Sequence, residues 1–364
     1  MNVLVLATAT RSGGGLTIYR QFLAYLSNYI GEHKFYIFVD PAMDTPKIKG
    51  VYYELLETVS WKQRIYWDNV GLKKWCKSRE VKPDVIISFQ NTGVNLNCRQ
   101  IIYYHQSLPF YPQKWNPFKA SERKSFFYKY VYPYFVKRTL NDNCQVIVQI
   151  PFIKKKFVSR FRFPEERVFV MSPDLEKIDA SKIKAKTLDH KFFHLIYAAG
   201  HDPYKEHRTI IEAVYLLRLQ NPDLVENLKI HFTIAEKDNL VITNLVQEKQ
   251  LEKQFIFEGR IPHDDLLSLY KACDGSLFPS TIETLGLPLN EAAAFGLPIL
   301  AADLDYAHEV IGRYDGVKFI STNDYAAWAK GIEDLCLEKS KYNPLIPLES
   351  SWPKFFELIN KETI

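Results

Sequence analysis

The chain has 364 residues, more than a single domain usually holds, so we expect two domains of roughly 150 to 200 residues. Hydrophobic residues at 47% and charged residues at 24% are ordinary for a soluble globular protein, and no run of about 18 uncharged apolar residues could span a membrane. The net charge of +5 combines 27 basic and 15 acidic residues in 1–180 with 20 and 27 in the remainder. This asymmetry indicates either different partners for the two halves or attraction between them.

The cysteines and the first residues bear on the cellular compartment. Five widely spaced cysteines without a C-x-x-C motif indicate reduced thiols and no zinc site. The chain begins with MNVLVLATAT, which leads into an apolar strand and lacks the basic start of a signal peptide. We therefore expect a cytoplasmic protein.

A strand, a glycine-rich loop and a helix form the first predicted unit. Residues 2–10 are a nearly continuous apolar run, typical of a strand buried on both faces of a parallel sheet. Residues 11–15 are expected to form a loop, in which Gly14 and Gly15 bring the backbone close to a phosphate or simply make a tight turn. A dinucleotide-binding loop fits poorly, because its third glycine would fall at Ile18.

Strands and helices alternate through the rest of the first half. Apolar runs at 51–56, 84–90 and 99–105 predict strands, and a helical segment at 67–80 lies between the first two. This order predicts a doubly wound parallel sheet, in which ligands bind at the C-terminal ends of the strands. His105 stands at such an end, where a lone histidine serves either the structure or a ligand.

Residues 114–138 combine basic and aromatic side chains. They contain seven Lys or Arg, nine aromatic residues and one acidic residue, Glu122. Such a segment is typical of a nucleic-acid surface, of a membrane-surface segment, or of a helix with buried rings and a solvated basic face. No nucleic-acid motif accompanies it, so we expect no nucleic-acid partner. Its place in the basic half favours contact with an anionic membrane or a lipid-linked acceptor.

The second half repeats the alternation of strands and helices. A strand, a helix and a short strand are expected within 144–175, and a linker without apolar periodicity follows at 176–190. A buried strand at 192–200 then leads through a polar loop into an amphipathic helix at 207–219, and 255–280 predict a strand, a turn, a helix and a strand.

The stretch PSTIETLGLPLNEAAAFGLP, residues 279–298, follows a buried strand and predicts a loop before a short apolar helix. Pro288 suits the first turn of this helix, and Gly296 suits its end. Backbone N–H groups from Leu287 to Asn290 would then point at an anion, which the helix dipole also favours.

Two carboxylates bracket this helix start. Glu291, early in the helix, either accepts hydrogen bonds from a sugar hydroxyl or only complements the dipole, and Glu283 lies in the loop. The E-x7-E pair around G-L-P, ending in EAAAFGLPIL, resembles the signature of the retaining GT-B glycosyltransferases of family 4, the glycosyl transferases group 1 type. The resemblance covers nearly the whole chain and is strongest from about 196 to 312.

The resemblance implies an α/β protein of the GT-B fold, with two Rossmann-like doubly wound parallel-sheet domains facing a central cleft. The implied domains are an acceptor-side domain at 1–178 and a nucleotide-sugar domain at 190–345. A C-terminal helix within 346–364 would pack back on the first domain. In this family the residue matching Glu291 holds the ribose of the nucleotide, and the residue matching Glu283 faces the donor sugar.

The resemblance also implies roles for residues elsewhere in the second domain. Lys205, followed by TIIEAV, matches a lysine beside the leaving diphosphate, where an ammonium neutralises the growing charge. His201 stands where an arginine is usual, and either it or another residue replaces that cation. Arg260 and Ile261 lie at the turn where the nucleotide base docks, and Leu287 begins the phosphate-facing helix.

In the first domain, the resemblance implies that Gly14 and Gly15 approach the donor diphosphate. His105 would contact the donor sugar or the acceptor. After the central motif, PILAADLDYAHEVIG is expected to form a strand and a loop that holds Asp303 and Asp305, neither of which the family requires.

The resulting hypothesis is a retaining glycosyltransferase that uses a UDP- or GDP-sugar and builds a cell-surface polysaccharide or glycolipid. No D-x-D metal loop is recognised, so we expect no metal and no other cofactor. The acceptor would be a saccharide or a lipid-linked saccharide. A sugar-nucleotide 2-epimerase of the same fold and a scaffold protein with a decayed site remain as alternatives, the latter because of His201 and the replaced glycine turn at Ala235 and Glu236.

Overall fold

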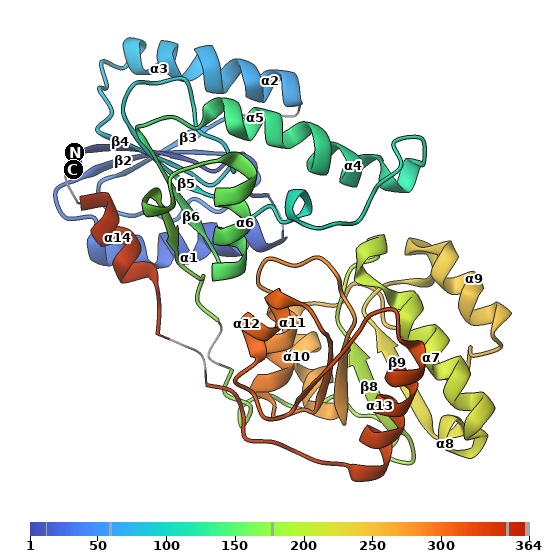
Figure 1. Cartoon of the computed structure of the whole chain (residues 1–364). Helices are drawn as coiled ribbons and strands as arrows, with labels where there is room; N and C mark the ends of the chain where they lie inside the picture. The colour runs from blue at the N-terminus through green and yellow to red at the C-terminus, as the bar shows by residue number, and fades with distance from the viewer. Residues whose placement is uncertain (12, 58–59, 176–177, 347–348, 361–364) are drawn as a thin grey trace. The chain divides into compact units, whose positions relative to one another are not determined.

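The structure is a computed structural model in which two compact units are distinguished (Figure 1). One unit contains Met1–Asp174 together with Glu349–Ile364, and the other contains Leu175–Leu348. Of the linker expected at 176–190, residues 176 and 177 lie outside the described residues. The described residues are 1–11, 13–57, 60–175, 178–346 and 349–360.

The first unit is built on a parallel sheet of seven strands in the order β3-β2-β1-β4-β5-β6-β7. Such a sheet is buried on both faces, which explains why its inner strands are mostly apolar. The strands are β1 Asn2–Leu6, β2 Lys34–Val39, β3 Val51–Leu55, β4 Val85–Ser88, β5 Arg99–Tyr103, β6 Cys144–Val148 and β7 Val168–Val170.

Successive side chains along each strand point to opposite faces of this sheet. Val3 and Val5 of β1 pack into one core, while Leu4 and Leu6 pack into another on the opposite face. The helices of this unit are α1 Gly13–Tyr29, α2 Trp61–Tyr66, α3 Leu72–Ser78, α4 Arg123–Phe126, α5 Tyr132–Thr139, α6 Pro151–Phe161 and α14 Trp352–Asn360.

Helix α14 belongs to the first unit although it comes from the end of the chain. It lies beside α1 in Figure 1, and its Trp352, Phe355 and Phe356 are buried in the same core as Val3. The ring of Phe356 stacks on that of Phe22 of α1, with centroids 5.6 Å apart. Aromatic burial of this size is a large apolar contribution to the core.

The second unit contains a parallel sheet in the order β10-β9-β8-β11-β12-β13. Its strands follow the order 3-2-1-4-5-6 of a doubly wound nucleotide-binding sheet. The strands are β8 Phe193–Tyr197, β9 Leu228–Phe232, β10 Phe255–Phe257, β11 Gly275–Phe278, β12 Ile299–Ala302 and β13 Val317–Ile320. The prediction of parallel, doubly wound sheets is thus confirmed in both units.

The helices of the second unit connect these strands, as right-handed parallel crossovers require. They are α7 His207–Gln220, α8 Pro222–Glu226, α9 Leu240–Glu248, α10 His263–Ala272, α11 Leu287–Ala294, α12 Asp305–Ile311 and α13 Tyr325–Glu338. None of the helices among the described residues is both long enough and apolar enough to span a membrane.

Two local predictions differ from the structure. Gly14 and Gly15 lie in the first turn of α1, which begins at Gly13, and therefore not in a loop. Glycine disfavours helix interiors, but the following apolar face of Ile18 and Phe22 packs into the core and outweighs that preference. Asp305 begins helix α12 instead of lying in a loop.

Candidate functional site

Helix α11 begins at the stretch that carries the E-x7-E pair. Gly286 before it has φ +57, a left-handed conformation that glycine adopts without strain, and Pro288 occupies the first turn. Gly296 after it has φ +69, and a β-carbon there would overlap the carbonyl oxygen of Tyr342. Backbone geometry therefore requires the glycines at both ends of the helix, and Pro288 is compatible with its first turn.

Fewer backbone N–H groups point outward from this helix start than the sequence suggested. Pro288 has no N–H group, and the N–H of Leu289 donates to the carbonyl of Gly286 at 2.9 Å. Of the four residues from Leu287 to Asn290 that were expected to offer N–H groups to an anion, Pro288 and Leu289 therefore do not.

Glu291 lies in the second turn of α11 with one carboxylate oxygen unsatisfied. Its Oε1 is 3.4 Å from Nε2 of His263, while its buried Oε2 has no hydrogen-bond partner among the described residues. Both polar side-chain atoms of the neighbouring Asn290 are also buried without a partner there. Buried polar groups are normally hydrogen-bonded, so this turn of α11 presents acceptors suited to the hydroxyl groups of a ligand.

The structure brings Lys205 and Glu283 together, although 78 residues separate them. Nζ of Lys205 lies 2.5 Å from Oε1 of Glu283, and the hydroxyl of Ser280 donates to the same oxygen at 2.8 Å. The two charged side chains are only 17% and 14% exposed. A shielded pair of this kind places an ammonium and a carboxylate where solvent screening is weak.

The backbone around Lys205 is held from two sides. The hydroxyl of Tyr197, at the end of β8, donates to the carbonyl of Lys205. The N–H of Thr281 donates to the carbonyl of Tyr204 at 2.9 Å, and the Thr281 hydroxyl donates to the same carbonyl at 3.1 Å. The loop that contains Glu283 and the turn that contains Lys205 are therefore fastened to each other by the backbone as well as by the ion pair.

His201, Arg260 and Ile261 lie in loops of the second unit. His201 is exposed, and its carbonyl accepts a hydrogen bond from Asn239 at 3.1 Å. Arg260 is exposed and Ile261 is partly buried, in the turn that follows Gly259, which has φ +71. Their roles at the phosphate and the base stay predictions.

A buried polar chain fixes the strand end from which this turn departs. Nδ1 of His194 lies 2.9 Å from Nε2 of His231, whose Nδ1 lies 2.8 Å from Oε1 of Glu258. The other oxygen of Glu258 accepts from Lys186 at 2.7 Å. The hydrogen bond from His231, with help from Lys186 and against the effect of burial, lowers the pKa of Glu258 to about 2. A fixed carboxylate thus immediately precedes Gly259.

In the first unit, the structure brings Gly15 and His105 together. A β-carbon at Gly15 would lie 3.5 Å from Nε2 of His105, so glycine lets the helix start approach the imidazole closely. Asn91, which has φ +64, accepts from the backbone N–H of His105 at 2.6 Å, and its Nδ2 lies 3.3 Å from Nε2 of His105.

His105 is held in its neutral form. Burial first, and the nearby guanidinium of Arg64 second, lower the pKa of His105 to about 4, against the favourable effect of the Tyr103 carbonyl. Its Nδ1 is buried and has no hydrogen-bond partner among the described residues. Because the amide of Asn91 donates to Nε2 of the neutral ring, the proton is assigned to Nδ1. This arrangement suits binding of a hydroxyl or carbonyl group and does not suit a cationic role.

Sequence reasoning did not single out Asn91, Ser280 or His263. Ser280 lies inside the quoted motif, and its place three residues before Glu283 was the one available signal. Asn91 and His263 reach His105 and Glu291 only through tertiary structure.

Comparison with solved structures defines the fold class. The chain is similar to WaaG, a glycosyltransferase involved in lipopolysaccharide biosynthesis, with a TM-score of 0.66 and 15% identity over 93% of each chain. It is also similar to Anabaena HepE in complex with UDP and glucose, with a TM-score of 0.62 and 17% identity over 93% of this chain and 90% of that one. At these identities the likeness shows the fold, which is GT-B.

A family model matches most of the second unit. Residues 179–347, slightly less than half of the chain, match the model of the glycosyl transferases group 1 family. The O-antigen chain mannosyltransferase B of Escherichia coli is 24% identical over 179 residues, which cover 47% of this chain and 46% of that protein. The chain spans about half the length of the first curated relatives it matches.

Proposed function

We propose that the protein transfers a sugar from a nucleoside diphosphate sugar to an acceptor hydroxyl, with retention of anomeric configuration and without a metal ion. One observation carries the proposal: the ammonium of Lys205 lies 2.5 Å from the carboxylate of Glu283, on loops fastened to each other next to α11. In this proposal the pair supplies a cation and a sugar-binding carboxylate close in sequence to the helix that carries Glu291, within the part of the chain that matches the group 1 glycosyltransferase model.

The proposed chemistry needs no nucleophile from the protein. The bond between the anomeric carbon and the diphosphate oxygen breaks, and the acceptor oxygen bonds to the same carbon on the same face. The acceptor proton passes to an oxygen of the leaving diphosphate. Lys205 stabilises the charge that develops on this diphosphate, which is the function a metal ion serves elsewhere.

The carboxylates and His105 take positioning roles in this proposal. Glu291 accepts from the ribose hydroxyls through its unsatisfied Oε2, and Glu283 accepts from a hydroxyl of the donor sugar. Nδ1–H of the neutral His105 donates to a sugar oxygen. In the second unit, Leu287 is assigned to the diphosphate and Arg260 and Ile261 to the base; for the first unit, the family resemblance assigns the backbone at Gly14 and Gly15 to the diphosphate.

The names of similar proteins suggest a class of substrate. The E. coli relative acts in O-antigen chains as a mannosyltransferase, and WaaG acts in lipopolysaccharide biosynthesis. We therefore propose a hexosyl donor, with GDP-mannose as the first candidate, and a cell-surface polysaccharide or glycolipid as the acceptor. HepE, which was solved with UDP and glucose, makes UDP-sugars the second class to test.

Titration with UDP and with GDP tests the nucleotide site directly. We expect calorimetric heat with one of them at near-millimolar concentration, and the preferred base then names the donor class. No heat with either nucleotide would contradict the proposal and favour a scaffold protein. With the preferred base known, product analysis of the corresponding sugar nucleotides separates transfer to an acceptor from 2-epimerisation of the sugar.

The basic and aromatic segment 114–138 supports peripheral membrane contact as part of this proposal. Lys129 is buried and donates to the carbonyls of Tyr111 and Gln113, so it serves the fold. Phe118 and Tyr134, in contrast, are 87% and 64% exposed. The exposed basic side chains of the segment are Lys114, Lys119, Arg123, Lys124, Lys137 and Arg138.

Replacing Phe118 and Tyr134 together with serine is expected to weaken binding to anionic vesicles at least several-fold. Exposed rings insert at the interface, and each nearby Lys or Arg contributes about 1 kcal/mol at an anionic surface. Co-sedimentation with phosphatidylcholine vesicles, with and without 30% phosphatidylglycerol, measures the effect. The control is Val241→Ser, because Val241 is an apolar residue of the second unit whose exposure, 79%, lies between those of Phe118 and Tyr134. Membrane contact through this segment is contradicted if the wild type binds both kinds of vesicle equally. It is also contradicted if the double variant binds anionic vesicles as tightly as the wild type.

A further inference from the structure

A pocket of about 530 Å³ lies in the first unit between two helical segments. One segment is α2 with the π-helical turn Trp67–Gly71 that follows it, and the other is α5. The loop from Thr92 to Asn95 forms part of the lining between them. The pocket has the volume of a small-ligand site, and neither Gly15 nor His105 lines it.

Asp68 is the unusual group in this pocket. Its side chain is 13% exposed, and its closest charged contact is Nε of Arg64, 3.8 Å from Oδ2. Its buried Oδ1 has no hydrogen-bond partner among the described residues. Burial raises the pKa of Asp68 to about 6 although Arg64 opposes the shift. Because an unsatisfied buried acceptor costs about 1 to 3 kcal/mol, this carboxylate is suited to a ligand hydroxyl.

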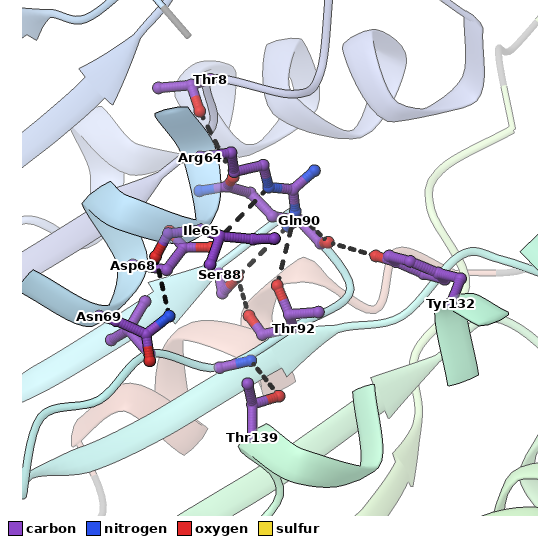
Figure 2. Close-up of polar contacts among 12 residues, drawn as sticks. Thr8, Arg64, Ile65, Asp68, Asn69, Ser88, Gln90, Thr92, Tyr132 and Thr139 are labelled. Atoms are coloured by element: carbon purple, nitrogen blue, oxygen red, sulfur yellow. Dashed lines mark hydrogen bonds and ion pairs between the residues drawn. The ribbon is translucent and has the colours of Figure 1, made fainter. Parts of the chain in front are cut away.

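The π-helical turn explains how the helix and the loop form one wall. Such turns loosen the regular helix ladder and are frequent at functional sites. Here the carbonyl of Asp68 accepts from the N–H of Asn95 at 3.1 Å, and the carbonyl of Ile65 accepts from Nδ2 of Asn69 at 2.8 Å. Figure 2 shows Asp68, Asn69 and Ile65 on this segment, with Thr92 and Thr139 on the neighbouring elements. The backbone of the turn thus holds Asn95 beside Asp68.

The guanidinium of Arg64 is engaged by the protein. Its Nη2 donates to the carbonyl of Gln90 at 2.7 Å and to the hydroxyl of Thr92 at 3.5 Å. A ligand anion would have to compete for these contacts and would also meet the carboxylate of Asp68. The other basic residue of the lining, Arg138, is exposed. The charges therefore favour an uncharged ligand over a phosphate or a sulfate.

The remaining lining residues suit a saccharide. Three amides, Asn69, Asn95 and Asn141, and the carboxylate of Asp68 supply donors and acceptors for neighbouring hydroxyl groups. Ile65 and Phe135 supply apolar surface for the C–H face of a sugar ring. We propose that this pocket is an accessory site for one or two uncharged sugar units.

The pocket is connected to His105 through a single turn of the chain. Gln90, whose carbonyl accepts from Arg64 and from the Tyr132 hydroxyl, is followed directly by Asn91, which binds His105. Figure 2 shows Gln90 between Arg64 and Tyr132. A sugar in the pocket would therefore adjoin the turn that orients His105. Resting on the proposed function, the bound sugars belong to the acceptor glycan and are not the unit that reacts.

Binding of neutral sugars to the full-length protein tests the site. The probes are di- and trisaccharides of mannose, glucose, galactose and N-acetylglucosamine, with inorganic phosphate and sialyllactose as anionic probes. We expect at least one neutral probe to bind the wild type, with its Kd raised about 10-fold or more by Asp68→Asn and several-fold by Asn95→Ala. Asn97→Ala is the matched control, because Asn97 lies two residues away and its amide contacts Asn143. Its Kd should equal that of the wild type.

Several outcomes separate this inference from the proposed function. Neutral-sugar binding that survives Glu291→Ala, in a variant with weakened nucleotide binding, supports a site independent of the donor. No binding by any neutral probe, or equal Kd values for wild type, Asp68→Asn and Asn95→Ala, overturns the inference even if nucleotide binding is found. Binding of phosphate that Asp68→Asn strengthens overturns it in favour of an anion site. Asn95 is exposed, so Asn95→Ala keeps the test valid if Asp68→Asn is unstable.

Discussion

Replacing Lys205 with alanine is expected to lower kcat for sugar transfer by about 100- to 1,000-fold, the usual effect of removing one charge-stabilising group from a shielded site. The ammonium lies 2.5 Å from Glu283 on a pair of loops that the backbone already fastens. Alanine removes the cation and keeps those backbone bonds. Turnover is measured as release of the preferred nucleoside diphosphate, once titration has named it.

The melting temperature of the Lys205→Ala variant must be measured as well, to separate a loss of catalysis from a loss of folding. The hydroxyl of Ser280 still donates to Glu283, so the carboxylate keeps one partner and we expect only a small change in melting temperature. Lys318→Ala is the control, since Lys318 forms a more exposed ion pair with Asp334 in the same unit. Its turnover should match the wild type. A collapse of the melting temperature with nearly normal turnover would make Lys205 a structural residue.

Replacing Glu291 with alanine is expected to raise the Kd of the preferred nucleotide by about 10- to 150-fold, because hydrogen bonds to a charged group contribute about 1.5 to 3 kcal/mol. Its side chain lies in the second turn of α11, and its buried Oε2 has no hydrogen-bond partner among the described residues. Calorimetric titration gives the Kd. An unchanged affinity would refute the ribose role.

The control for the Glu291 variant must test charge as well as position. Glu252→Ala removes an exposed carboxylate from the same unit and should leave the Kd unchanged. Parallel weakening in both variants would indicate a general effect of net charge. Titration with the free base separates the roles further, because a ribose contact should not affect binding of the base alone.

The alternation of apolar runs and helical segments predicted a doubly wound parallel sheet in the first half, and the resemblance to GT-B glycosyltransferases implied a second such sheet. Buried parallel strands are mostly apolar, and the backbone geometry at both ends of α11 requires the glycines that marked them in the sequence. The helix start at Gly13 was missed, because three glycines favour a loop locally while the packing of Ile18 and Phe22 decides the outcome. Local preferences are weak compared with burial.

The candidate site was predictable only where its residues are close in sequence. Glu283 and Glu291 share one motif, but the contact of Glu283 with Lys205 joins loops from different strands. The pocket around Asp68 was not foreseen at all. Asp68 lies in a π-helical turn, and such a turn has no characteristic spacing of apolar residues by which a sequence reveals it. An aspartate within a helical segment ordinarily indicates a solvated face.

Helix α14 affects the order in which the two units complete their folding during synthesis. In topological terms, residues 175–348 are an insertion within a discontinuous first unit. The aromatic side chains of α14 complete a core whose other members lie in the first half of the chain. During synthesis, the first unit to leave the ribosome is therefore the last to be finished, and its apolar surface over α1 stays uncovered until the whole second unit has been made.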